Sequence, residues 1–213
     1  MVTLEEVTEL VKIYKPLVEG TFNIEIEPIK VALLNSKENY EQFAKEIHAG
    51  SLPRIMKYSL LGLNAFQCLI RDRTPAMTTS IGKIEVDLTK EISRDYAEIS
   101  VVHELSHRIK DKVTEPLLNG FISRRQRYVS EGFCEFVALD YFKNYQRDLS
   151  KALDAYRLRR FFGSNLDEYT VGYRYFRAIA SPNDRPEDIL DVLKWNRSYK
   201  EIEVLSRFAP ALS

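Results

Sequence analysis

The pentapeptide His103-Glu104-Leu105-Ser106-His107 limits what this chain can fold into more than any other stretch. It places two histidines at positions i and i+4 of a helix, where both imidazoles can reach one metal ion. The opposite face of this helix is apolar and carries Val101, Val102, Leu105 and Ile109. This pattern is typical of an amphipathic helix with one face in the core. It predicts a helix from Ser93 or Arg94 to Asp111 whose histidine face borders a cleft.

Two imidazoles that leave a coordination position open most often hold Zn²⁺, which is the cofactor we expect here. Bound zinc lowers the pKa of its water towards neutrality and so makes it a nucleophile at physiological pH. Glu104 lies beside the histidines and can reach that water without binding the metal. The spacing thus predicts that Glu104 acts as general base and then general acid in the hydrolysis of a peptide bond. The alternative is a chance match on an amphipathic helix with two solvated histidines.

A second stretch, Tyr128-Val129-Ser130-Glu131-Gly132-Phe133-Cys134-Glu135-Phe136-Val137, resembles the N-E-G-F-A-E-F helix of the gluzincin zinc metallopeptidases. In that clan, which includes thermolysin and the zinc aminopeptidases, the third zinc ligand is a glutamate on a second helix. The resemblance implies that Glu131 binds the metal with His103 and His107, and that Glu135 hydrogen-bonds and orients His103. The gap between His107 and Glu131 is longer than in the aminopeptidases, a departure that a short insertion would explain. A solvated acidic helix face is the alternative for Glu131 and Glu135.

The same resemblance implies a fold class. It predicts an α+β, zincin-like architecture, with a small mixed sheet and the motif helix in the N-terminal lobe and helices in the C-terminal lobe. The chain would then be a single, compact, minigluzincin-like metallopeptidase domain with lobes at about 1–112 and 113–213. By analogy, Thr79 to Glu85 would form an edge strand that pairs with extended substrate, unless it is an ordinary edge strand with a bend. Tyr169 or Tyr173 would donate a hydrogen bond to the oxyanion, although packing with a hydrogen-bonded hydroxyl is the other interpretation.

The composition argues against several other classes of protein. The 213 residues carry 31 basic and 31 acidic side chains, so the balanced charge predicts no attraction to nucleic acid or to an acidic membrane. No apolar run is long enough for a membrane span, and the first residues lack the basic start and apolar stretch of a signal peptide. Cys68 and Cys134 are too few for a disulfide framework and are expected to be free thiols. These features predict a cytoplasmic protein and leave its oligomeric state open, and the partner that the motif implies is a peptide or protein substrate.

The remaining segments predict a mixture of helices and strands around the motif. A capping-box pattern of Thr3 and Glu6 opens a helix that Pro16 should end or kink. Alternation of apolar and acidic residues predicts a strand over 22–29. Ser130 is a candidate N-cap for the helix that carries the third ligand. Further helices are expected at 37–47, 149–162 and 187–195, short strands or a buried helix at 59–70, and a strand at 77–88.

Taken together, these features predict a zinc-dependent metallopeptidase in which His103, His107 and Glu131 hold the metal and Glu104 is the general base. A catalytically silent, zinc-containing peptide-binding or regulatory module is the first alternative, and a purely structural helix pair without metal is the second. His48, the only other histidine, lies far upstream of the motif and is expected to be solvated. A metzincin site would need a third histidine shortly after the motif, and the sequence has none there.

Overall fold

The computed structural model describes residues 2–33, 77–80, 83–86, 93–114, 124–141, 168–195 and 198–208. Most of these residues are helical. The helices are α1 (Leu4–Phe22), α4 (Arg94–Val113), α5 (Arg124–Phe136), α7 (Glu168–Ile179), α8 (Pro186–Lys194) and α9 (Tyr199–Ser206), and α5 continues into a short π-helical segment, η2 (Val137–Tyr141). The strands in this part of the chain are β1 (Lys30–Leu33), β2 (Met77–Ser80) and β3 (Lys83–Val86).

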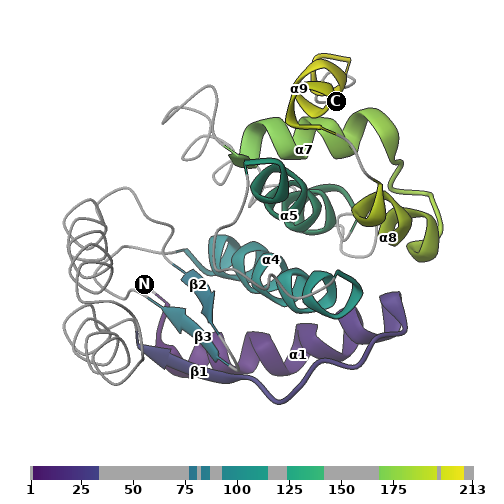
Figure 1. Cartoon of the computed structure of the whole chain (residues 1–213). Helices are drawn as coiled ribbons and strands as arrows, with labels where there is room; N and C mark the ends of the chain where they lie inside the picture. The colour runs from purple at the N-terminus through teal and green to yellow at the C-terminus, as the bar shows by residue number, and fades with distance from the viewer. Residues whose placement is uncertain are drawn as a thin grey trace, which may run out of the picture.

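The helices form a stack in which the motif helix, α4, occupies an inner layer (Figure 1). Helix α1 packs against α4, α4 against α5, α5 against α7, and α7 against α9, while α8 touches α4, α1 and α5. The small sheet contacts α4 and α1 and lies on the side of the stack away from α7. Helix α4 is therefore covered on two sides, and most of its residues from 96 to 109 are buried.

Aromatic side chains link three of these layers. Phe133 of α5 lies 5.9 Å from both Phe22 of α1 and Phe176 of α7, measured between ring centroids. Phe22 also stacks on Tyr141 of η2 at 5.8 Å. Aromatic pairs at such distances contribute about 0.5–1.5 kcal/mol each beyond the burial of their surface. The cluster fixes α5, and with it Glu131, relative to α1 and α7.

Helix α1 confirms one sequence prediction and corrects another. The Thr3 hydroxyl accepts a hydrogen bond from the Glu6 backbone N–H (3.2 Å), and the Glu6 carboxylate accepts one from the Thr3 N–H (2.7 Å), which is the predicted capping box. Pro16 does not end the helix, which continues to Phe22. A proline inside a helix costs about 3 kcal/mol, and burial of the apolar face offsets this cost. The buried residues of that face are Val7, Leu10, Val11, Tyr14, Val18 and Phe22.

The sheet is too small for the predicted fold class. Its strand order is β1-β3-β2, with β1 parallel and β2 antiparallel to β3. Each of the strands has only four residues. The prediction of an α+β, zincin-like architecture is therefore wrong, because the described chain is a helical fold with a minor sheet.

The segment that follows α1 shows why the alternation of apolar and acidic residues predicted a strand that does not form. Its apolar and acidic residues alternate as in a half-buried strand, yet residues 24–29 belong to no strand. Instead, the Ile24 N–H donates to the Glu19 carbonyl (3.2 Å) and the Ile26 N–H donates to the Glu19 carboxylate (2.7 Å). Ile26 is still buried in the core. An extended segment can thus bury alternate residues without pairing as a strand. Here the N–H groups of Ile24 and Ile26 donate to Glu19 near the end of α1.

The predicted substrate-binding strand is two strands. Strand β2 ends at Ser80 and β3 begins at Lys83, and the two pair antiparallel with Thr79 opposite Ile84. Strand β3 is central among the three described strands, so both of its edges are paired. A continuous strand over 77–88 is therefore wrong. Of the predicted segment, only the β2 part lies at an edge of this sheet, where an extended peptide could add.

Several predicted features lie outside the described residues. They are the helices at 37–47 and 149–162, the segment at 59–70, His48 and Cys68. The last predicted helix is confirmed as α8, which starts at Pro186 and ends at Lys194. Across the described ranges, none of the helices combines the length and the apolar character needed to cross a membrane.

Candidate metal centre

Helix α4 carries both histidines of the H-E-x-x-H motif, as the sequence predicts. Ser93 caps its N-terminus by accepting a hydrogen bond from the Tyr96 N–H (3.2 Å), and the helix runs from Arg94 to Val113. His103 is only 2% exposed. The side chains of both histidines contact α5. The histidine face therefore packs against a neighbouring helix, where the sequence predicted an open cleft.

Helix α5 brings the carboxylate of Glu131 to the two imidazoles. His103 Nε2 lies 3.3 Å from Glu131 Oε2, and His107 Nε2 lies 3.5 Å from the same oxygen. The two Nε2 atoms are 3.2 Å apart. These three atoms form a nearly equilateral triangle. Two helices that are far apart in sequence thus supply three potential ligand atoms that face one another.

A zinc ion fits this triangle. Zinc binds imidazole nitrogen and carboxylate oxygen at about 2.0–2.2 Å, so neighbouring ligands of a tetrahedral ion lie about 3.3–3.5 Å apart. The sides of the triangle measure 3.2, 3.3 and 3.5 Å. In addition, Glu131 Oε2 is buried without a hydrogen bond of good geometry among the described residues. Its lone pairs are therefore available to a cation.

The second nitrogen of each imidazole also meets α5. His103 Nδ1 is 3.7 Å from Glu135 Oε1, and His107 Nδ1 is 3.4 Å from Ser130 Oγ. Partners at this position fix the tautomer and the ring orientation of a metal-binding histidine. The gluzincin resemblance implies a hydrogen bond from His103 to Glu135, but the distance is longer than a hydrogen bond and His103 Nδ1 has no hydrogen-bond partner among the described residues. Ser130 lies inside α5, so its predicted role as an N-cap is wrong.

The thiol of Cys134 is a further neighbour that sequence reasoning did not assign to the centre. Cys134 is a free thiol and is buried. Its sulfur and one ring nitrogen each of His103 and His107 all lie within 4.8 Å of one another. Ser130 and Cys134 are four residues apart and so share one face of α5. That spacing, beside a predicted ligand at position 131, is the sequence signal that could have identified both.

Carboxylates give the centre a negative character. Glu104 lies in the turn of α4 between the two histidines and is 5% exposed. Glu131 and Glu135 add two more carboxylates, with side-chain exposures of 21% and 3%. Buried acidic groups need a compensating cation or hydrogen bonds. Carboxylate oxygens and imidazole nitrogens are both groups that can bind a divalent cation.

The pKa values of Glu131, His107 and Cys134 are shifted by burial and by their neighbours at the centre. Burial acts to raise the pKa of Glu131, but the adjacent imidazoles outweigh it and hold the pKa far below its usual value of 4.5. Burial acts to lower the pKa of His107, but Cys134 and Glu131 outweigh it and raise the pKa well above 6.5. Burial also raises the pKa of Cys134 to about 11. A thiol with this pKa is neutral at pH 7, so at that pH Glu131 is the charged neighbour that raises the pKa of His107.

The two candidate oxyanion donors, Tyr169 and Tyr173, lie one turn apart on α7 and have different neighbours. The ring centroid of Tyr169 is 6.1 Å from that of His103, and the side chain is partly exposed. Tyr173 is 2% exposed, and the guanidinium carbon of Arg177 lies 5.9 Å from its ring centroid. Tyr169 is thus the tyrosine that the structure places beside a histidine of the centre.

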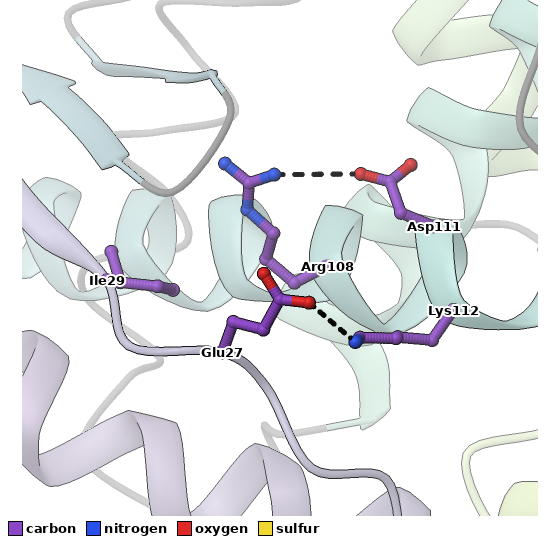
Figure 2. A pocket seen from close by; sticks show the side chains of 5 residues that line it. All are labelled: Glu27, Ile29, Arg108, Asp111 and Lys112. Carbon is purple, nitrogen blue, oxygen red and sulfur yellow. Dashed lines mark hydrogen bonds and ion pairs between the residues drawn. The ribbon is translucent and has the colours of Figure 1, made fainter.

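A separate pocket opens next to the C-terminal half of α4 (Figure 2). It has a volume of about 230 Å³ and is lined by Glu27, Ile29, Arg108, Asp111 and Lys112. Lys112 Nζ is 2.9 Å from Glu27 Oε1, and Arg108 Nη1 is 3.8 Å from Asp111 Oδ2, so the charges of its lining pair with one another. The predicted metal and catalytic residues do not line this pocket. It is therefore distinct from the candidate metal centre.

No protein-family model matches this chain, and no curated protein or solved structure is significantly similar to it. The chemistry of the centre must therefore be derived from its own donors. These are two imidazoles on α4 and carboxylates and a thiol on α5. Such donors suit zinc, which accepts nitrogen, oxygen and sulfur ligands in a tetrahedral arrangement.

Proposed function

We propose that this protein is a zinc-dependent metallopeptidase that hydrolyses bonds in peptide or protein substrates. The observation that carries the proposal is the triangle of His103 Nε2, His107 Nε2 and Glu131 Oε2, whose sides of 3.2, 3.3 and 3.5 Å suit one tetrahedral zinc ion. Three protein ligands with a fourth position for solvent are typical of catalytic zinc. The proposed ligand set is of the gluzincin type, here on a helical fold.

Glu104 is the proposed general base and acid. When bound, zinc supplies a Lewis acid that polarises a carbonyl and lowers the pKa of water. Glu104 lies in the same helical turn as both histidines and is shielded from bulk solvent. From there its carboxylate takes the proton of the attacking water and later passes it to the leaving amine. Because Glu104 is not a proposed ligand, its loss should leave zinc binding intact.

Other side chains orient the ligands or assist the reaction. Glu135, 3.7 Å from His103 Nδ1, and Ser130, 3.4 Å from His107 Nδ1, are the proposed partners that would orient the two rings. Tyr169, beside His103, donates a hydrogen bond to the substrate carbonyl oxygen as negative charge develops on it. Loss of Glu135 or Ser130 should weaken zinc binding, whereas loss of Tyr169 should slow turnover, so the two kinds of role can be separated by measurement.

The test compares the wild type with Glu104→Gln. Purified without chelator, both proteins should contain zinc by elemental analysis, and only the wild type should cleave a quenched fluorescent peptide library. Loss of a general base lowers kcat by about 10²- to 10⁴-fold. Glu98→Gln is the matched control on the same helix, because the Glu98 carboxylate contacts Tyr14 and Arg94. This control should keep both zinc and activity.

Two other outcomes would replace the proposal. Zinc-loaded wild type that binds peptides but cleaves none would identify a catalytically silent peptide-binding or regulatory module. Wild type that takes up no zinc, even when zinc is supplied during refolding, would identify α4 and α5 as a purely structural helix pair. In either case the metallopeptidase assignment would be wrong.

A further inference from the structure

Cys134 occupies a position that the proposed reaction does not use. It is buried, and its sulfur lies within 4.8 Å of a ring nitrogen of His103 and of His107. A buried cysteine usually behaves as a small apolar side chain. Here it adjoins two imidazoles that belong to the proposed metal centre. This environment is that of a metal-binding thiol.

The periodicity of α5 explains why the thiol reaches the centre. Cys134 follows Glu131 by three residues, and side chains at this spacing are neighbours on a helix surface. Phe133 and Phe136 belong instead to the aromatic core, where both contact Phe176 of α7. Helix α5 thus presents two different potential ligands, a carboxylate and a thiol, to the histidines of α4.

We infer that Cys134 is a fourth zinc ligand that closes the metal centre in a resting form of the protein. This inference rests on the proposed function, because it concerns a second state of the same centre. Neighbouring sulfur and nitrogen ligands of tetrahedral zinc lie about 3.6 Å apart. The sulfur lies within 4.8 Å of a ring nitrogen of each histidine, so the site closes when the thiol moves towards the ion. Four protein ligands define a closed zinc site, whereas three ligands with solvent define an open one.

The ligation step has a simple balance of atoms. The S–H bond of Cys134 breaks, its proton passes to solvent, and the sulfur forms a bond to the metal ion. When the centre opens, the sulfur leaves the ion and takes back a proton from solvent, which frees the fourth position. No electron is transferred in either direction. Exchange of this ligand for solvent would then decide whether the peptidase is latent or active.

Cobalt substitution tests the thiolate ligand without relying on turnover. Co²⁺ adopts the coordination of zinc, and a cobalt–thiolate bond adds an intense near-ultraviolet charge-transfer band that imidazole and carboxylate ligands do not give. We expect this band in the full-length wild type loaded with Co²⁺ and its loss in Cys134→Ser and Cys134→Ala. Cys68→Ser, which replaces the only other cysteine, is the matched control and should keep the band. The visible d–d bands report that each variant still binds cobalt.

The results distinguish this inference from the proposed function. Cobalt bound to the wild type without the charge-transfer band, or a band that persists in Cys134→Ser, overturns the ligand role of Cys134 and leaves the peptidase proposal standing. A band in the wild type, with no hydrolysis by the zinc forms of the wild type or Cys134→Ser, supports the ligand and overturns the peptidase. Faster hydrolysis by Cys134→Ser than by the wild type supports both. No bound cobalt in the wild type overturns both.

Discussion

Gly132 of α5 and Gly172 of α7 lie backbone against backbone where their helices meet. A Cβ atom built on Gly132 would overlap the carbonyl group of Gly172, and one built on Gly172 would overlap the carbonyl oxygen of Tyr128. Only glycine permits so close an approach of two backbones. The contact also positions the candidate centre, because Glu131 directly precedes Gly132 and Tyr169 lies one turn before Gly172.

Replacement of Gly132 by alanine should therefore destabilise the fold. Because the new methyl group must displace the backbone of α7, we expect the free energy of unfolding to fall by about 3 kcal/mol or more. Urea unfolding followed by circular dichroism measures the change. Gly20→Ala is the control, since Gly20 lies exposed in α1 and an added Cβ meets no atom within 4 Å. The free energy of unfolding of the Gly20→Ala variant should rise by about 0.5–1 kcal/mol, because alanine has a higher helix propensity than glycine. Similar stabilities of the two variants would contradict the close contact.

Zinc affinity should depend on Glu131 more than on the residues that only orient the histidines. Loss of such an orienting partner lowers metal affinity by about 10- to 100-fold, which is the range we expect for Ser130→Ala and Glu135→Gln. Glu131→Ala removes a proposed ligand and should lower zinc affinity by more than about 100-fold. Competition with a chromophoric chelator measures all three. His48→Ala, the control at the third histidine, should bind zinc like the wild type. Equal zinc retention in Glu131→Ala and His48→Ala would refute the ligand assignment.

Chelator-treated protein should gain most stability from the Glu131–His107 pair in mildly acidic solution. The lowered pKa of Glu131 contributes stability above its usual value of 4.5, and this contribution is lost as the pH falls through the lowered pKa. The raised pKa of His107 contributes stability fully below 6.5, and this contribution is lost as the pH rises through the raised pKa. Both are present together between pH 4.5 and 6.5.

The measurement is the difference in free energy of unfolding between the wild type and Glu131→Gln across pH, in the presence of chelator. This difference should be largest between pH 4.5 and 6.5 and should decline on both sides. With zinc present the maximum should move to higher pH, because protons and zinc compete for the same imidazole nitrogens. A difference that grows steadily above neutral pH without zinc would contradict the coupling.

Features that depend on neighbouring residues were predictable from the sequence. The predicted capping box at Thr3 forms, and the motif helix begins at Arg94, at the predicted start. Helix α9 lies where we predicted no element, yet it begins with the same signal, because Ser198 and Glu201 form a second capping box. Pro16 does not end α1 as one form of the prediction had it, because burial of the apolar face of α1 outweighs the local helix propensity.

Features that depend on packing between distant segments were not predictable. The i, i+4 spacing of His103 and His107 follows from helix geometry alone, whereas the contacts of Ser130 and Cys134 arise only when α5 packs on α4. The strand predicted over 22–29 failed for a related reason. The alternation over residues 24–29 is the same whether the backbone pairs with a strand or with the end of a helix, and here Glu19 takes the place of a strand.

Tyr169 is the tyrosine whose loss should slow the chemical step. A donor to the oxyanion acts mainly in the transition state, so Tyr169→Phe should lower kcat by about 10²- to 10³-fold with little change in KM or zinc content. Tyr173→Phe is the matched control one turn further along α7, where the ring is buried against Arg177. It should retain kcat. Steady-state cleavage of a fluorogenic peptide, with zinc analysis of each variant, measures both effects. Equal losses in the two variants would show that they act through the packing of α7, and a loss confined to Tyr173→Phe would reassign the donor.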